Sequence, residues 1–207
     1  MHTYGVEEGE SEVITCWEQF CGRLIAVRFA YFCGMKRVDG FEGLVIDSIP
    51  EFCRLMELPP PEHPLVSVIR FEWIKRLPAD WLPTVVLNFF SVWLKKEAGI
   101  GVMRFFLPGQ PVEGELNECG CWLMIHPELL WNYSVERNLD QYGFFVDSVS
   151  AALRLAGKEE KMMSGILQNI EQEYLPPVSA CCQEAILSHV ETLFIYADRF
   201  YRRQLLS

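Results

Sequence analysis

The fold is decided by residues 84–95, TVVLNFFSVWLK, where β-branched and aromatic side chains occupy both sets of alternating positions. Such residues favour strands, and a strand that is apolar on both faces is expected to be covered on both sides. Further strands are predicted over residues 66–71, 101–107 and 119–125. The strand over 101–107 ends at the turn 108–109. Several short strands separated by glycine and proline predict a sandwich or barrel.

The end of the chain has the pattern of two amphipathic helices. From residue 158, apolar side chains recur every three or four positions, at Met163, Ile166, Leu167, Ile170 and Tyr174. From residue 179 the same spacing holds for Cys182, Ile186, Val190, Leu193, Phe194, Ala197 and Tyr201. This spacing gives each helix one apolar face. Pro176-Pro177 interrupts helical structure, so a two-helix hairpin is predicted over residues 158–207.

These patterns divide the chain into three segments, of which the last is the predicted hairpin over residues 158–207. Residues 1–45 are an N-terminal extension of unknown role, partly helical because residues 12–31 carry apolar side chains at helical spacing. Residues 46–157 hold the predicted strands and short helices, including a turn of helix at 50–56. They also include a helix start at His126-Pro127, since proline is favoured at the first helical position.

Charge and cysteine content exclude some classes of protein. The 207 residues carry 18 Lys+Arg and 28 Asp+Glu, a formal net charge of −10, with no basic stripe for phosphate groups. The N-terminus carries Glu7, Glu8, Glu10 and Glu12 instead of a basic, then apolar, export signal. The eight cysteines are therefore expected to be reduced, in the cytoplasm. The apolar stretch 82–94 is shorter than the ~20 residues of a spanning helix, so no membrane contact is expected.

The sequence contains none of the common catalytic motifs, such as a nucleophile elbow, a P-loop, a dinucleotide fingerprint or His-Glu-x-x-His. We therefore expect no enzymatic activity and no cofactor. Cys119 and Cys121 with His126 are candidate metal ligands, but one intervening residue is too few for a zinc knuckle. Packing is the better interpretation, so no metal is expected.

Aromatic residues on the predicted strands could line a small-molecule pocket, but ordinary core packing is the favoured interpretation, because aromatic residues dominate protein cores. The set considered is Phe89, Trp93, Phe105, Phe106 and Trp122. The effector-pocket candidates chosen from it are Phe89, Trp93, Phe106 and Trp122.

An ensemble of short motifs over about residues 46–204 resembles a known family. The motifs are HPLVSVI (63–69), NFFSVWLKK (88–96), PGQ (108–110), GCWLMIHPELLWN (120–132), QYGFF (141–145), ALRL (152–155), KEEK (158–161), ILQNIEQEY (166–174) and YADRFYRRQ (196–204). Together they resemble the N-terminal domain of AraC-type transcription regulators, in the form common in Bacteroides-like bacteria.

The resemblance implies an α+β fold: a cupin-like (jelly-roll) β-barrel followed by a C-terminal two-helix hairpin. It implies a ligand-sensing domain for a small effector, and a homodimer formed through the last helix. The dimer-interface candidates are Ile186, Val190, Leu193, Phe194, Ala197 and Tyr201. DNA would be bound only by a helix-turn-helix domain that normally begins after residues 202–204. The chain ends at Ser207, so that domain is expected to be absent here.

Two departures from the family keep alternatives open. The family usually has another hairpin between residues 96 and 108, where this chain has only residues 97–107, so a strand pair is expected to be missing. A small-molecule-binding or enzymatic cupin is one alternative, although its clustered histidines are not seen. The four histidines lie far apart, at His2, His63, His126 and His189. A degenerate remnant that does not bind DNA is the other alternative.

Overall fold

The computed structural model describes residues 44–74, 85–112, 119–131, 133, 139–146, 152–174 and 180–206. All of them belong to one compact unit, Phe41–Ser207. The helix expected at residues 12–31 lies outside the described residues, as does almost all of the N-terminal extension. Among the residues described, no helix combines the length and the apolar character needed to cross a membrane.

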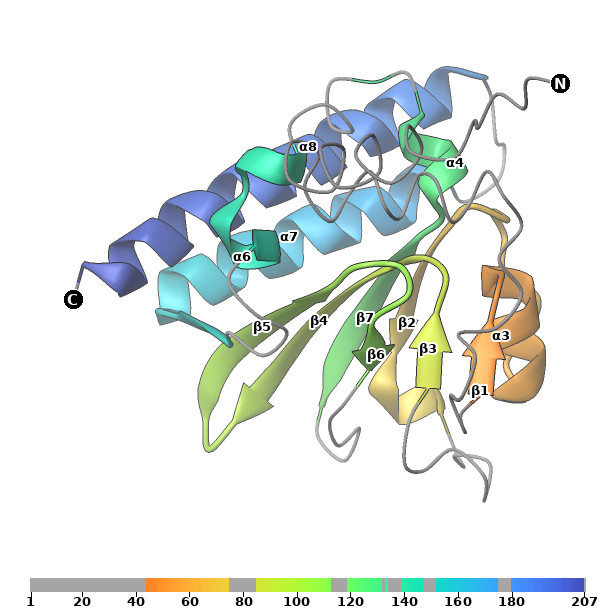
Figure 1. The fold of residues 1–207 in the computed structure, drawn as a ribbon, viewed down its shortest axis with the longest axis horizontal. Helices are drawn as coiled ribbons and strands as arrows, with labels where there is room; N and C mark the ends of the chain where they lie inside the picture. The colour runs from red at the N-terminus through yellow and green to blue at the C-terminus, as the bar shows by residue number, and fades with distance from the viewer. Residues whose placement is uncertain are drawn as a thin grey trace, which may run out of the picture. The chain divides into compact units, whose positions relative to one another are not determined.

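The described residues form an α+β fold with two β-sheets, mostly antiparallel (Figure 1). The larger sheet is wholly antiparallel and has the order β2 (Val66–Arg70), β7 (Gly120–Ile125), β4 (Phe90–Glu97), β5 (Ile100–Phe106) and β8 (Leu153–Leu155). The smaller sheet has the order β1 (Leu44–Ile46), β3 (Val85–Leu87) and β6 (Pro111–Val112). Strand β3 is parallel to β1 and antiparallel to β6.

The prediction of one continuous strand over residues 84–95 is wrong, because the structure divides this segment into two strands that belong to different sheets. Strand β3 belongs to the smaller sheet and β4 to the larger one. Between them the Asn88 N–H donates to the carbonyl of Ile46 at 2.9 Å, and its side-chain amide donates to the Asp47 carboxylate. These bonds hold the polar residue at the point where the chain passes from one sheet to the other.

Strands β4 and β5 are joined by the two-residue turn Ala98-Gly99. Both residues have positive φ, 50° and 81°, as in the primed turns whose twist matches that of a hairpin. Residues 97–107 therefore supply the end of β4, this turn and β5, with no further strand pair. The outer edge of β5 is covered by β8, which pairs with Gly101–Met103.

The helices include both of those predicted at the end of the chain. Helices α7 (Gly157–Glu173) and α8 (Ala180–Leu205) lie side by side across one face of the larger sheet (Figure 1). The shorter helical elements are α3 (Ile49–Leu55), η1 (Phe71–Trp73), α4 (Pro127–Leu130), η2 (Leu139–Gln141) and α6 (Gly143–Val146). The predicted start at His126-Pro127 is confirmed, because His126 caps α4 by accepting a hydrogen bond from the Glu128 N–H.

The larger sheet separates two apolar layers. Directly opposed residues of paired strands share a face, so the register assigns every side chain to one side. Leu94, Met103 and Leu123 face the helices and are at most 5% exposed. The opposite face, which we call the inner face, packs on the smaller sheet and α3. Its buried cluster includes Ile46, Phe52, Ile69, Phe71, Leu87, Phe89, Trp93, Phe106, Trp122 and Met124.

Tyr174, at the end of α7, closes the free edge of the larger sheet. Its buried hydroxyl oxygen accepts a hydrogen bond from the Val68 N–H of edge strand β2 at 3.0 Å, and burial raises the pKa of Tyr174 to about 12. Tyr174→Phe would leave that N–H buried without an acceptor. We expect a loss of about 1–3 kcal/mol in the free energy of unfolding, measured by urea denaturation.

The control for this prediction is Tyr196→Phe, on the part-exposed side of α8, which should change the free energy of unfolding by less than about 0.5 kcal/mol. Equal effects of the two substitutions would show that the Tyr174 hydroxyl does not support β2.

Candidate ligand-binding site on the inner face of the larger sheet

Three polar side chains form a row across the inner face. Trp122 of β7 lies directly opposite Trp93 of β4, and Trp93 lies directly opposite Arg104 of β5. Ser91 precedes Trp93 by two residues on the same strand and therefore projects from the same face. We call Ser91, Trp93, Arg104 and Trp122 the donor cluster.

The polar atoms of the donor cluster are buried without partners. Ser91 Oγ, Trp93 Nε1, Arg104 Nε and Trp122 Nε1 have no hydrogen-bond partner in the part of the chain that the structure describes. Ser91 and Trp122 are 0% exposed, and Trp93 is 2% exposed. Buried polar groups are nearly always paired, and each unpaired group costs about 1–3 kcal/mol. Four such atoms on one face therefore set the donor cluster apart from an ordinary apolar core and make it the candidate site.

Arg104 of the donor cluster lies in a group of three charged side chains on the same face, with Lys95 and Glu97. Lys95 Nζ lies 3.1 Å from Glu97 Oε1, and Arg104 Nη2 lies 3.3 Å from the same oxygen. The hydrogen bond from Lys95 lowers the pKa of Glu97; burial opposes this shift, and the charges of Arg104 and Lys95 add to it. Lys95 Nζ also lies 6.0 Å from the centre of the Trp93 ring. The formal charge of the three groups is +1.

Glu97 makes the stability of this region dependent on pH. A carboxyl whose pKa is lower in the folded chain stabilises the fold when ionised, and that contribution is lost as the pH falls through the lowered pKa. Glu97→Gln should therefore reduce the free energy of unfolding at pH 7 by at most about 1 kcal/mol, because the carboxylate is partly solvated. The difference from the unmodified chain should disappear in acid. Urea denaturation at several pH values measures it; a difference that grows in acid would contradict the assignment.

The four effector-pocket candidates lie in one buried cluster. Phe89, Trp93, Phe106 and Trp122 are at most 3% exposed. The Trp93 ring lies 5.1 Å from that of Trp122 and 5.2 Å from that of Phe106, and the Phe89 ring lies 6.3 Å from that of Phe52 in the same cluster. The structure thus brings the four together. The two tryptophans differ from an ordinary core in having unpartnered N–H groups.

Sequence reasoning missed the polar members of the site, which are Ser91, Lys95, Glu97 and Arg104. The signal was present in the alternation of β4, where Ser91, Trp93, Lys95 and Glu97 take one face. Phe90, Val92 and Leu94 take the other face. A strand with one apolar face and one face of tryptophan and polar residues indicates a site more strongly than a strand that is apolar throughout.

The six dimer-interface candidates lie in the interior of the single chain. Ile186, Val190, Leu193, Phe194, Ala197 and Tyr201 are at most 3% exposed. Phe194 illustrates why, since its ring lies 5.4 Å from Phe145 of α6 and 6.5 Å from Phe105 of β5. The apolar face of α8 is thus covered within the chain, and these side chains are not available to a second copy.

The candidate metal ligands serve separate purposes. Cys119 is exposed before β7, whereas Cys121 is buried within it, and burial raises the pKa of the Cys121 thiol to about 11. His126 caps α4. Within the described ranges, no group of three or more His, Cys, Asp or Glu side chains is arranged to hold a metal ion.

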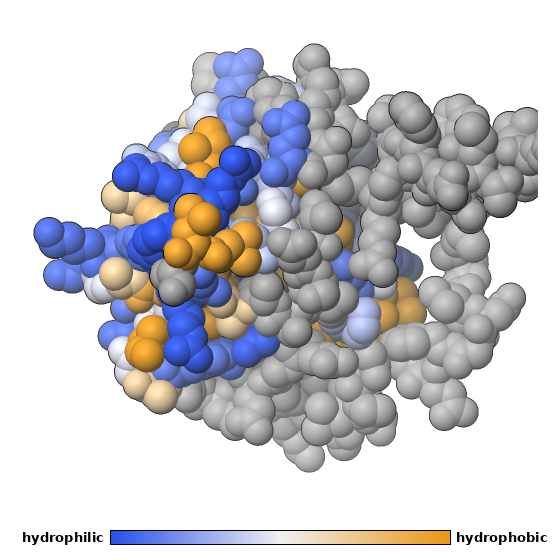
Figure 2. Space-filling model, turned by 60° about the vertical axis from the view of Figure 1, so that its left-hand side comes forward, coloured by the Kyte–Doolittle hydropathy of each residue, from blue (hydrophilic) through white to orange (hydrophobic). Residues whose placement is uncertain are grey.

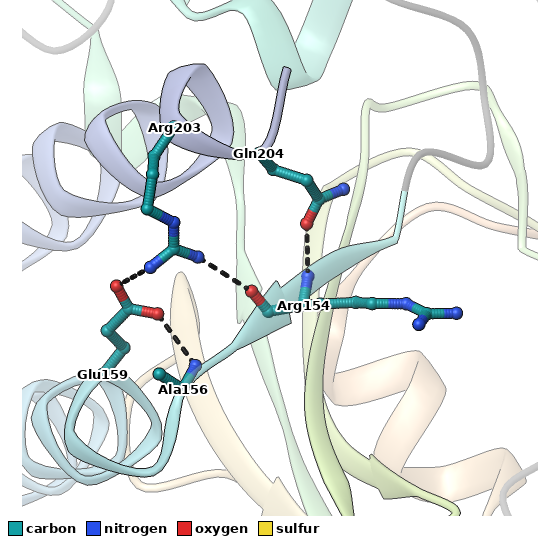
Figure 3. A network of polar contacts seen from close by, with 5 residues as sticks. All are labelled: Arg154, Ala156, Glu159, Arg203 and Gln204. Atoms are coloured by element: carbon teal, nitrogen blue, oxygen red, sulfur yellow. Dashed lines mark hydrogen bonds and ion pairs between the residues drawn. The ribbon is translucent and has the colours of Figure 1, made fainter. Parts of the chain in front are cut away.

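A polar network ties the C-terminal end of α8 to the larger sheet (Figure 3). Arg203 is bonded to the Glu159 carboxylate and donates to the carbonyl of Arg154 at 3.3 Å. The side-chain oxygen of Gln204 accepts the Arg154 N–H at 2.8 Å. Because Arg154 lies on β8, which pairs with β5, β8 links the end of α8 to the strand that carries Arg104 of the donor cluster.

No protein-family model matches the chain, and a search of the curated proteins finds no match.

Proposed function

We propose that this chain is the ligand-sensing and dimerisation domain of an AraC-type transcription regulator, in the cytoplasm and without catalysis of its own. The observation that carries the sensing role is the donor cluster, where four buried polar atoms have no partner among the described residues. The regulatory role is supported by the motif ensemble over residues 46–204. DNA would be bound only by a helix-turn-helix domain outside these residues, consistent with the net charge of −10.

We propose a cupin-like arrangement for the two sheets. They face each other across the buried cluster of the inner face, and the chain passes from one sheet to the other at Asn88-Phe89. A small molecule held between the sheets would be shielded from water. That shielding strengthens each hydrogen bond that it accepts from the donor cluster.

Ligand binding would reach the end of α8 through β5 and β8. A ligand atom bonded to Arg104 acts on β5, which pairs with β8, and Arg203 and Gln204 hold β8 from the end of α8. These contacts form a contiguous path of hydrogen bonds and strand pairing, of the kind that can carry coupling between distant groups. Binding would thereby favour one position of the helix end over another.

A homodimer through α8 would use the outward side of that helix, because its opposite side is covered by the chain itself. Ile195 on the outward side is 54% exposed. On the face that carries the C-terminal end of α8, Figure 2 shows small apolar patches separated by hydrophilic side chains. Sedimentation equilibrium tests the dimer: Ile195→Glu should weaken it, and a monomer at high micromolar concentration without the substitution would contradict it.

A thermal-shift screen of small metabolites tests ligand sensing. At about 100 times its dissociation constant a ligand adds about 2.7 kcal/mol to the stability of the folded state, which gives a clear rise in melting temperature. Trp93→Phe, which removes an indole N–H, should weaken such binding. Trp131→Phe is the matched control, since Trp131 is 46% exposed. Ligands that stabilise both variants equally would contradict the proposed site.

A further inference from the structure

We propose that the last turn of α8 is a latch on the outer edge of β8, and that this turn can release while the rest of α8 stays packed on the sheet. The latch comprises Arg203 and Gln204 of α8 together with Glu159 of α7 (Figure 3). The inference rests on the proposed sensing function for its regulatory meaning, because such coupling is carried by elements that have two discrete arrangements.

The outer edge of β8 is closed by side chains in place of another strand. On its other side β8 pairs with β5, and the backbone groups of successive residues alternate between the two edges. At the outer edge, Gln204 Nε2 donates to the carbonyl of Ala152 at 3.1 Å, and Gln204 Oε1 accepts the N–H of Arg154 at 2.8 Å. One carboxamide thus fills the places that the backbone N–H and C=O of a neighbouring strand would occupy.

Two further side chains complete this closure. Arg203 Nη2 donates to the carbonyl of Arg154 at 3.3 Å, and Glu159 Oε2 accepts the N–H of Ala156 at 2.8 Å. Glu159 Oε1 is bonded to Arg203 as well. Four outward backbone groups between Ala152 and Ala156 are therefore bonded to three side chains, of which two move with the last turn of α8.

Polar bonds fasten the latch to the sheet. Beyond Tyr201, which is 3% exposed, none of residues 202–206 is buried. Hydrogen bonds and ion pairs near the surface add little net stability, because water replaces them when the groups are released. The helix before this turn is anchored differently, since Phe194 and Ala197 are fully buried. Release is therefore expected to be local, because parts with few buried apolar contacts open more readily than the core.

The edge that release uncovers is suited to exposure. An open strand edge tends to pair with other chains, and short length and charged side chains oppose this pairing. Strand β8 has three residues, and the side chain of Arg154 at its centre is exposed. In an antiparallel pair of β8 strands centred on Arg154, like charges would face each other, which is unfavourable. The latch can therefore open and close without association of the chain.

Amide hydrogen exchange followed by NMR tests the latch on the full chain with no added compound. The Arg154 amide reports on the latch, because its bond is to Gln204. The amides of Leu153 and Leu155 report on the sheet, because they face β5 by the alternation of the strand. If the turn releases locally, the Arg154 amide should exchange about tenfold or more faster than those two, after correction for the intrinsic rate of each residue.

A substitution in the latch should act on the outer edge alone. Gln204→Met removes both bonds of the carboxamide and keeps the length and the helix propensity of the side chain. It should raise the exchange rate of the Arg154 amide about tenfold, since two hydrogen bonds are lost, and change the rates of the two sheet amides by less than about twofold. Arg202→Met is the matched control on the same turn, because Arg202 is paired with Asp198 of its own helix at 2.7 Å. It should leave the Arg154 rate unchanged.

Ionic strength provides a second readout. The ion pair between Arg203 and Glu159 is part of the latch, and the side chain of Arg203 is 49% exposed, so salt screens the pair. Raising sodium chloride from about 0.05 to about 0.5 M should increase the Arg154 exchange rate about twofold in the unmodified chain. In Arg203→Met, where the pair is missing, this salt effect should disappear.

Three results would overturn the latch. They are equal exchange of the Arg154 amide and the sheet amides in the unmodified chain, no effect of Gln204→Met, and an equal effect of Arg202→Met. Circular dichroism checks that each variant is folded. If a variant does not fold, the salt effect in the unmodified chain decides, and its absence would overturn the latch as well.

Sedimentation equilibrium tests whether the uncovered edge stays unpaired. Gln204→Met should show the same state of association as the unmodified chain, and larger oligomers would contradict a latch that opens harmlessly. All of these measurements are made without a ligand. A failed latch therefore leaves ligand sensing by the donor cluster untouched, and a failed ligand screen leaves the latch in place.

Discussion

Gly120→Ala should lower the free energy of unfolding by about 3 kcal/mol or more, the upper range for overpacking. A Cβ atom at this position would lie 2.5 Å from the carbonyl oxygen of Leu94 and 3.0 Å from Cα of Lys95. Both are backbone atoms of β4, which is held between β7 and β5. Neither strand can move without breaking the hydrogen bonds that align Trp122 with Trp93. Urea denaturation followed by circular dichroism measures the loss.

Gly101→Ala is the matched control on β5. There the added Cβ would meet side-chain atoms of Glu160, the nearest being Cγ at 2.9 Å. A flexible carboxylate chain can rotate away, at the expense of its 3.4 Å ion pair with Lys96. We expect a loss of about 1 kcal/mol or less, since that pair is solvated. Losses of equal size for the two glycines would show that β7 does not approach β4 as closely as the structure indicates.

Phe194→Ala should lower the free energy of unfolding by about 3–5 kcal/mol, the usual cost of truncating a buried phenylalanine. Phe194 is fully buried, and its ring lies 5.4 to 6.5 Å from the rings of Phe145, Tyr142, Phe144 and Phe105. It therefore joins α8 to α6 and to the larger sheet. Thermal and urea denaturation should both detect the change.

The neighbouring residue on α8 provides the contrast. Ile195 is 54% exposed, so Ile195→Ala should change the stability of the single chain by less than about 0.5 kcal/mol. A Phe194→Ala variant that keeps its stability but loses a dimer would show that the apolar side of α8 contacts a second copy instead of the chain's own sheet.

The regular elements could be predicted because their patterns are local and long. Helices α7 and α8 repeat an apolar face over 17 and 26 residues, and the cap at His126 depends on adjacent residues alone. Strands β1, β6 and β8 were not predicted, since each has three residues or fewer and forms through distant partners. The division at Asn88 likewise depends on Ile46 and Asp47. An amphipathic pattern also cannot show what covers the apolar face, which is why the α8 residues were assigned to a dimer.

The candidate site was predictable only in part. Trp93 and Trp122 could be chosen as pocket candidates because they are aromatic residues on predicted strands, although core packing was the favoured interpretation of them. Arg104 could not, because its place beside Trp93 follows from the register between β4 and β5. The unpaired state of the two indole N–H groups depends on every neighbour in three dimensions. The feature that distinguishes the site from a core is therefore one that a single sequence does not display.

The central claim is that a bound small molecule supplies acceptors to the donor cluster, and the indole N–H signals test it most directly. In two-dimensional proton–nitrogen spectra, substitutions Trp93→Phe and Trp122→Phe identify the two signals. We expect both to lie at positions of unbonded N–H groups in the free protein. With a small molecule identified by the thermal-shift screen they should move, saturably, toward hydrogen-bonded positions. Those of Trp73 and Trp131, which are 47% and 46% exposed, should stay in place. Signals of Trp93 and Trp122 that are already hydrogen-bonded, or that do not move when that molecule binds, would contradict the account.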